Sequence, residues 1–253
     1  MQKNVLCIVQ ARLNSTRLPG KVLLPLKNRP VIEHVFNQLS FATKLNNIIL
    51  ATSTEESDNK LEVWAINNSK EIFRGNLNDV LERYYFAAKK YNGDIIVRIT
   101  GDCPLIDPKI VDTVVNEFVE GGFDYFSNTI NPTFPDGLDT EVFSYDALET
   151  TYFNAKLKSE REHVTPYIKN NPGTFKLGGF ENKVNYEKYR WTIDNQEDYE
   201  FLKIIFEKLY IEDQYISWKD VIRFIDDKPE IININKHIKR NEGYEKSLIE
   251  DNL

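Results

Sequence analysis

The chain has 253 residues, of which 41% are apolar and 12% aromatic, enough for one large α/β domain or two small ones. Its net charge of −7 argues against general nucleic-acid binding, which depends on clustered cations. No apolar run approaches the roughly eighteen residues of a membrane span, and the first residues lack the pattern of a secretory signal. We therefore expect a cytoplasmic protein with no nucleic-acid partner and no membrane insertion.

Short apolar runs alternate with helical patterns through the first half of the chain. Runs rich in Val and Ile predict strands buried on both faces, and apolar residues at helical spacing predict helices between them. This alternation is typical of a mostly parallel sheet flanked by helices. The strands are expected at residues 5–9, 47–52 and 94–100, and the helices at 31–41, 58–68, 79–91 with Asn78 as N-cap, and 108–120.

Beyond residue 122 the expected elements are shorter and mixed. No linker rich in proline or serine precedes them, so we predict a small mixed α/β insertion on the sheet and not a second domain. The strands are expected at 124–127, 140–144, 174–178 and 189–193, and the helices at 146–156, 160–169, 196–209 and 217–226. The predicted single domain, 1–253, comprises a core at 1–122 and 190–228, the insertion at 123–189 and a C-terminal extension at 229–253.

The segment A-R-L-N-S-T-R-L-P-G-K, residues 11–21, follows the first predicted strand and is rich in cations. Residues 1–32 contain no Asp or Glu, although the overall acid content predicts about five there. Loops that follow parallel strands are where α/β sheets bind ligands, so we predict an anion site; a solvated basic face is the alternative. The loop matches neither the P-loop nor the dinucleotide fingerprint. The groups suited to phosphate oxygens are the hydroxyls of Ser15 and Thr16 and the charges of Arg12, Arg17 and Lys21.

Two further loops place an aspartate directly after a predicted strand. Asp102 lies in R-I-T-G-D-C-P-L-I-D-P, and Asp194 ends the strand in R-W-T-I-D-N-Q. Taken singly, Asp102 could be a turn former and Asp194 a helix N-cap. Taken together with the cationic loop they suit Mg²⁺, which binds one or two carboxylates plus substrate phosphates. We therefore predict that Asp102 and Asp194 hold Mg²⁺ on the opposite side of a polyphosphate from the loop.

These motifs resemble those of the sugar-acid cytidylyltransferases, the family that activates 3-deoxy-manno-octulosonate and acylneuraminate with CTP. Residues 11–21 look like the N-terminal signature, G-D-C-P-L-I-D like the metal loop, and I-D-N-Q-E-D-Y-E like a third family motif. Four more strings are similar to the spore coat polysaccharide (SpsF-type) branch, and all occur in the same order. They are F-R-G-N-L-N-D-V-L-E-R-Y (73–84), D-G-L-D-T-E-V-F-S-Y-D-A-L (136–148), R-E-H-V-T-P-Y-I (161–168) and N-E-G-Y (241–244).

The resemblance implies a Rossmann-like nucleotide-diphospho-sugar transferase fold and a Mg²⁺-dependent transfer of CMP from CTP to a sugar-derived acceptor, with release of pyrophosphate. Arg12 and Lys21 would hold the triphosphate, and Asp102 and Asp194 the metal. The insertion, 123–189, would bind the acceptor or form the contact of a homodimer. The other implied substrate-binding residues are Ala11, Leu13, Ser15 and Arg17 in the loop, and Thr52, Ser53 and Arg74 near the cytosine and ribose.

The acceptor side is predicted from two local patterns. Asp139 and Glu141 are two residues apart on one face of a strand and could form a pocket wall. Arg161, near a predicted helix start, could bind an acceptor carboxylate or phosphate bidentately. A lone histidine in that position, His163, more often forms structural hydrogen bonds than ligates a metal. Residues 84–86, Tyr-Tyr-Phe, have the spacing of a packed helix face and indicate core.

Two alternatives stay open at this point. A glycosyltransferase that consumes a nucleotide sugar uses a similar architecture, but it usually carries a D-x-D metal motif, whereas G-D-C-P offers one aspartate. A non-catalytic nucleotide-binding protein would be expected to carry substitutions in the loop or at the aspartates, and both are intact. The identity of the acceptor is not predicted, and the preference for CTP rests on the resemblance.

Overall fold

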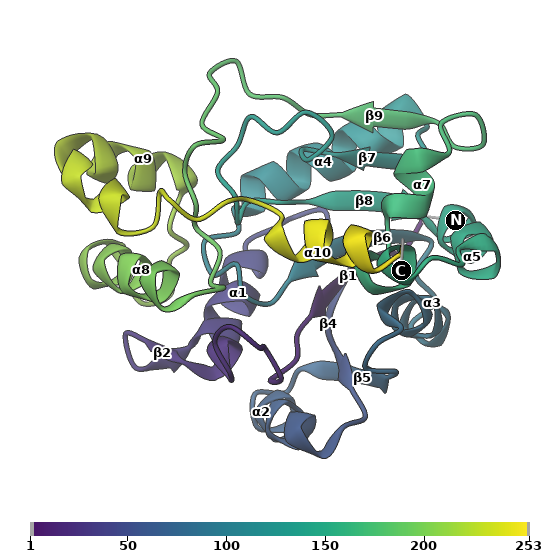
Figure 1. Ribbon diagram of the computed structural model, residues 1–253, viewed down its shortest axis with the longest axis horizontal. Coiled ribbons are helices and arrows are strands. Elements are labelled where there is room, and N and C mark those ends of the chain that lie inside the picture. The colour runs from purple at the N-terminus through teal and green to yellow at the C-terminus, as the bar shows by residue number, and fades with distance from the viewer. Residues whose placement is uncertain (1–2, 252–253) are drawn as a thin grey trace.

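The computed structural model describes residues 3–251, and its centre is a seven-stranded sheet with the order β5-β4-β1-β6-β8-β7-β9 (Figure 1). Residues 1–2 and 252–253, the ends of the expected domain 1–253, lie outside the described residues. Four adjacent strands are parallel, as the alternation predicts. They are β5 (Glu71–Gly75), β4 (Asn47–Ser53), β1 (Val5–Gln10) and β6 (Ile95–Thr100).

The apolar character of β1 follows from burial on both faces of the sheet. Leu6 and Ile8 pack into one core cluster, whereas Cys7 and Val9 pack into the other. Helices α1, α2, α4, α8 and α9 contribute to the second cluster, and α3, α5 and α7 to the first. Their bounds are α1 (Val31–Leu39), α2 (Asn59–Asn67), α3 (Val80–Lys90), α4 (Pro108–Gly121), α5 (Tyr145–Asn154), α7 (Pro166–Asn170), α8 (Gln196–Leu209) and α9 (Trp218–Asp227).

The insertion extends the same sheet with strands of mixed direction. β8 (Glu141–Ser144) is antiparallel to β6 and to β7 (Tyr125–Ser127), and β9 (Leu177–Gly179) is parallel to β7. β9 begins later than the strand predicted at 174–178, because the N–H groups at 174 and 175 bond to Asn171 in a turn. The strand β5 is absent from the sequence prediction because its five residues contain only two apolar side chains.

Residues 189–193 do not form the predicted strand. Within the described chain, their β-type pairing is limited to an isolated bridge between Asp136 and Arg190. The Ile193 N–H donates to the carbonyl of Asp102 at 2.9 Å. The backbone groups of this segment are therefore satisfied by two loops and not by a strand ladder. The same bonds bring the segment that precedes α8 against the loop that follows β6.

Three smaller predictions are also wrong. The helix expected at 160–169 is divided into α6 (Lys158–His163) and α7, because Val164 adopts a φ of 72° and Pro166 follows. The N-cap of α3 is Asp79 and not Asn78, since the Asp79 carboxylate accepts the Glu82 N–H at 2.8 Å. Phe86 points outward and is 41% exposed, although its neighbours Tyr84 and Tyr85 are buried as predicted.

The C-terminal extension is ordered into a short 3₁₀ helix, Pro229–Ile234, and the helix α10 (Glu242–Glu250). A small two-stranded sheet, β2 (Pro25–Leu26) with β3 (Arg29–Pro30), lies ahead of α1. Across residues 3–251 we find no helix with the length and apolar character needed to cross a bilayer. In Figure 1, α10 lies in front of the central strands, far from the start of the chain in sequence but close to the edge where β1 and β6 end.

Candidate functional site

A cleft of about 840 Å³ lies at the carboxyl ends of β1 and β6. Its walls come from the loops after these two strands, from the segments that precede β8 and α8, and from α6 and α10. This is the edge of a parallel sheet at which α/β proteins bind ligands. The predicted site residues that line the cleft are Ala11, Arg12, Ser15, Arg17, Lys21, Asp102, Asp139, Glu141 and Asp194.

The loop after β1 is folded back on itself and anchored by a buried carboxylate. The Gly20 N–H donates to the Leu13 carbonyl at 2.9 Å, and Gly20 has a φ of 71°, a conformation that glycine adopts without strain. Asp58 is fully buried and accepts the Leu13 N–H at 2.7 Å and the Ser53 hydroxyl at 2.5 Å. The sequence pattern predicts Asp58 only as the start of a helix, so its role as the anchor of the loop is visible only in the structure.

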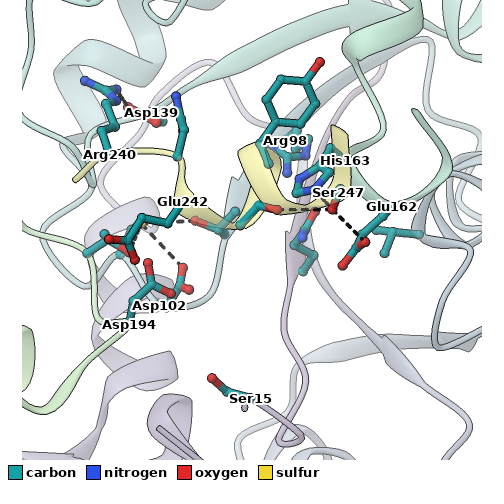
Figure 2. A pocket seen from close by; sticks show the side chains of 18 of the residues that line it. Ser15, Arg98, Asp102, Asp139, Glu162, His163, Asp194, Arg240, Glu242 and Ser247 are labelled. Atoms are coloured by element: carbon teal, nitrogen blue, oxygen red, sulfur yellow. Dashed lines mark hydrogen bonds and ion pairs between the residues drawn. The ribbon is translucent and has the colours of Figure 1, made fainter. Parts of the chain in front are cut away.

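The side chain of Lys21 joins the two aspartates that the sequence places far apart. Its Nζ lies 2.5 Å from Asp102 Oδ2 and 2.8 Å from Asp194 Oδ1, and Figure 2 shows the two carboxylates together. Burial alone lowers the pKa of Lys21, but the two carboxylates outweigh burial and raise it. Burial raises the pKa of Asp194, but Lys21 and Arg17 outweigh this and bring it to about 2. Lys21 and Asp194 are therefore both charged at neutral pH.

The two aspartates have the chemistry of a partial divalent-metal site. Asp102 and Asp194 both contact the ammonium group of Lys21, and proteins usually contribute one or two carboxylates to Mg²⁺. Among residues 3–251, no group of three or more His, Cys, Asp or Glu side chains is arranged to hold a metal ion. A metal at Asp102 and Asp194 would therefore take its remaining oxygen donors from a substrate or from water, as Mg²⁺ bound with a polyphosphate does.

The other end of the cleft is built around Glu141, the first residue of β8. Glu141 is ion-paired with Arg98 of β6 and accepts hydrogen bonds from the hydroxyls of Tyr125, at 2.6 Å, and Thr165, at 2.7 Å. Burial raises the pKa of Glu141, but Arg98 and Lys169 outweigh it and lower the pKa to about 2. Glu141 is therefore ionised, and the protein itself satisfies much of its hydrogen-bonding capacity.

The segment that leads into α10 and the start of α10 contact both ends of the cleft (Figure 2). Arg240 donates to Asp139 at 2.5 Å, so Asp139, one of the two residues predicted to form a pocket wall, is already in a salt bridge. Glu242 lies 2.9 Å from the Arg17 guanidinium, whose other terminal nitrogen is 2.8 Å from Asp194. A carboxylate of α10 is therefore bound to a cation that we predict for phosphate.

His163 forms contacts of the structural kind that its position predicts. Its Nε2 is 3.0 Å from the Ser247 hydroxyl, and its ring packs edge-on against Tyr244. The Ser247 hydroxyl also donates to Glu162 at 3.1 Å, and Arg12 lies 3.6 Å from Glu162. Burial and nearby cations lower the pKa of His163 to about 4, so its ring is neutral at pH 7. The histidine thus helps to attach α10 to α6.

Five predicted site residues do not line the cleft, and the prediction for Arg161 is corrected by its contacts. Nε and Nη2 of Arg161 donate to Asp79 at 2.9 and 2.5 Å, and Nη1 donates to two carbonyls, so the guanidinium supports the start of α3. Arg74 is held by the carbonyl of Ser53 at 2.9 Å and by Glu62 at 2.5 Å. The remaining three are Thr52 and Ser53, which are fully buried, and Leu13, which lines a smaller neighbouring pocket.

The structure also reveals cleft residues that sequence reasoning missed. Three buried polar atoms of cleft-lining residues have no hydrogen-bond partner in the described chain, namely Gln10 Oε1, Arg83 Nε and Arg98 Nε. Arg98 could have been found as the one charged residue in the apolar strand sequence I-I-V-R-I-T, residues 95–100. Arg190, whose guanidinium lies 2.7 Å from Asp194, occurs in the quoted R-W-T-I-D motif but was given no role. Arg240 has no comparable signal, because its partner is a hundred residues away along the chain.

The fold and this arrangement of cations and carboxylates at one sheet edge define a nucleotide-binding α/β enzyme, and comparison with known proteins gives the family. The model of the cytidylyltransferase family matches residues 6–227, so the chain belongs to that family and is a nucleotidyltransferase. The family match favours this assignment over the glycosyltransferase alternative and confirms the resemblance drawn from the motifs.

Two curated relatives and one solved structure are similar over nearly the full chain. An uncharacterized protein, MJ1063, from Methanocaldococcus jannaschii is 40% identical over 93% of this chain and 96% of its own length. The spore coat polysaccharide biosynthesis protein SpsF of Bacillus subtilis is 33% identical over 90% of this chain and 96% of its own. A cytidylyltransferase structure from Leptospira borgpetersenii superposes with a TM-score of 0.88 at 39% identity, covering 94% of this chain and all of that one.

Proposed function

We propose that the protein transfers CMP from CTP to a sugar acid, or to a sugar or polyol phosphate, in a Mg²⁺-dependent reaction that releases pyrophosphate. The observation that carries this proposal is the Lys21 bridge between Asp102 and Asp194 beside an acid-free cationic loop. It gathers cations for a triphosphate and carboxylates for a metal within one cleft. The relative named for spore coat polysaccharide biosynthesis supports a role in making surface polysaccharides or glycoconjugates.

In this reaction an oxygen of the acceptor attacks the α-phosphorus of CTP, and the bond from that phosphorus to the pyrophosphate oxygen breaks. Arg12, Arg17 and Lys21 bind the triphosphate and stabilise the negative charge that accumulates on departing pyrophosphate. Asp102 and Asp194 would hold the metal, which supplies charge neutralisation when it is bound. The chain itself positions the reactants, and no covalent enzyme intermediate is required.

The acceptor is assigned to the end of the cleft formed by Asp139, Glu141 and α10. Arg98 there has a buried Nε that finds no hydrogen-bond partner in the described chain, and a polar ligand could satisfy it. The acidic groups at this end are already paired with cations, Glu141 with Arg98 and Asp139 with Arg240. This internal neutralisation suits an acceptor with many hydroxyl groups and a single anionic group, as sugar acids and sugar phosphates have.

The proposal is tested by incubating the protein with Mg²⁺, one of CTP, UTP, GTP or ATP, and a panel of sugar acids, sugar phosphates and polyol phosphates. Release of pyrophosphate is measured with a coupled assay. We expect release with CTP that depends on both Mg²⁺ and an acceptor. Release of a nucleoside diphosphate instead, or absence of CTP binding in calorimetry, would contradict the proposal.

We also propose that two copies form a homodimer through the region of α5. Phe153 and Leu157 there are 68% and 48% exposed, and Phe86 of α3 adds a third exposed apolar side chain next to stacked Tyr85 and Tyr152. Clusters of exposed apolar side chains of this kind commonly mark protein contacts. Sedimentation equilibrium should give twice the mass of the chain, and Phe153→Glu should shift it to the monomer; a wild-type monomer at micromolar concentration would exclude the dimer.

A further inference from the structure

We propose that Arg190 is a positioning residue that gives the two oxygens of Asp194 different tasks. Arg190 binds Oδ2 from inside the protein, and Oδ1 is thereby presented to the cleft. The inference deepens the proposed function and rests on it, because it concerns how Asp194 would hold a divalent cation. Arg190 touches neither the nucleotide nor the acceptor in this account, and it acts only through Asp194.

The division between the two oxygens is visible in the contacts of Asp194. Arg190 Nη2 lies 2.7 Å from Oδ2. The two cleft cations, Lys21 and Arg17, both contact Oδ1, each at 2.8 Å. The cleft-facing contacts therefore converge on one oxygen, while the other is occupied by a guanidinium with 6% side-chain exposure. A cation that replaced Lys21 beside Asp102 would meet Oδ1.

The guanidinium is itself fixed by two other carboxylates. Its Nε donates to Asp198 at 2.9 Å, and its Nη1 donates to Asp136 at 2.7 Å. Because a planar guanidinium has its donors in fixed directions, three carboxylates on three sides leave Arg190 one orientation. The bond from Nη2 therefore also fixes the orientation of the Asp194 carboxylate.

The backbone of Asp194 is held by the same group of residues. Asp198 is fully buried at the start of α8 and accepts the N–H groups of Asp194 and Asn195, both at 3.0 Å. Asn235, directly after the 3₁₀ helix of the C-terminal extension, donates to Asp198 at 3.0 Å and to the Arg190 carbonyl at 2.9 Å, so the extension supports the arrangement. Side chain and backbone of Asp194 are thus fixed together, as partners of metal ligands commonly fix the ligands.

Charge alone does not explain an arginine at this position. A lysine would also neutralise buried carboxylates, but its ammonium group could not contact all three in the observed fork geometry. Replacing Arg190 by Lys therefore separates the positioning role from the charge. Arg161, whose guanidinium binds Asp79 through two nitrogens outside the cleft, offers a matched Arg→Lys control.

The experiment measures the affinity of the full chain for Mn²⁺, by the electron paramagnetic resonance of free Mn²⁺, with a non-hydrolysable CTP analogue present. The proteins are wild type, Arg190→Lys, Arg161→Lys and Asp194→Asn, each checked for folding by circular dichroism. We expect the dissociation constant for Mn²⁺ to rise about 10- to 100-fold in Arg190→Lys, the loss typical when a partner of a metal ligand is changed. Arg161→Lys should lower the melting temperature without changing the Mn²⁺ affinity.

The possible outcomes separate this inference from the proposed function. If Arg190→Lys is folded and binds Mn²⁺ within twofold of wild type, the positioning role is refuted while the metal site stands. If wild type and Asp194→Asn bind Mn²⁺ equally, the proposed metal site itself is refuted. If Arg190→Lys does not fold, the variant Asp136→Asn is used instead, because it loosens Arg190 but leaves the bond from Arg190 to Asp194. We expect a two- to tenfold weaker affinity of this variant for Mn²⁺. An unchanged Mn²⁺ affinity would refute the positioning role.

Discussion

The two ends of the cleft neutralise their carboxylates in different ways. At the end formed by the loop after β1, Lys21 and Arg17 come from one short segment and converge on the carboxylates of Asp102 and Asp194. At the end formed by β8 and α10, each acid has a cation brought from a distant part of the chain, as Glu141 has Arg98 and Asp139 has Arg240. In the proposed function, the first end exchanges its internal ion pairs for phosphate and metal. The second end keeps its ion pairs and recognises the acceptor by shape and hydrogen bonds.

The strongest test of this difference is removal of either aspartate at the first end. We expect Asp102→Asn and Asp194→Asn each to lower kcat by about three orders of magnitude or more, because the metal that neutralises the reacting phosphates would lose a ligand. The measurement is pyrophosphate release, with circular dichroism to establish that each variant is folded. A folded variant with near-normal turnover would remove that aspartate from the site.

The next largest effect is expected from the cations of the loop. Lys21→Ala and Arg12→Ala should each lower kcat/KM for CTP by about 10²- to 10³-fold, the loss typical when one preorganised charge at a developing anion is removed. Arg161→Ala, outside the cleft, serves as the comparison and should destabilise the fold more than it changes the KM for CTP. An unchanged kcat/KM in both loop variants would mean that the loop does not bind the triphosphate.

A smaller effect, an increase in the affinity for CTP, is expected when the contact between Glu242 of α10 and Arg17 of the loop is removed. Glu242→Gln removes the carboxylate that occupies Arg17, so CTP should bind about two- to fivefold more tightly, as expected for losing one partly exposed ion pair. Glu245→Gln, on an exposed position of the same helix, is the matched control and should leave the affinity unchanged. Weaker binding of CTP to Glu242→Gln, measured by calorimetry, would show that α10 assists the nucleotide and does not compete with it.

A separate test, on stability and not on activity, concerns the pH dependence at the second end. The pKa of Glu141 is about 2 in the folded protein against an ordinary value of 4.5, so protonation favours the unfolded chain between these values. Its contribution, roughly 3 kcal/mol, is present above pH 4.5 and is lost as the pH falls toward 2. Glu141→Gln should therefore lose stability less steeply over this window in urea titrations. Equal slopes for wild type and variant would contradict the ionised state of Glu141.

The residues that could be predicted from sequence are those in short local motifs, and the residues that could not are those paired with distant partners. The loop and the two aspartates were found because short motifs after apolar strands place them at one sheet edge, whatever the details of packing. The partners Arg98, Arg190 and Arg240 were missed as functional residues because their roles depend on contacts that only the tertiary structure creates. The strand expected at 189–193 failed for a related reason, since loops instead of a neighbouring strand satisfy its backbone.

We propose above all that Lys21, Asp102 and Asp194 form one nucleotide and metal site. Calorimetric titration of CTP tests this directly, because it needs no knowledge of the acceptor. We predict binding of CTP to the wild type that is strengthened by Mg²⁺, and loss of the Mg²⁺ effect in Asp102→Asn and Asp194→Asn. Absence of CTP binding to the folded wild type, or a Mg²⁺ effect that survives in both variants, would contradict it.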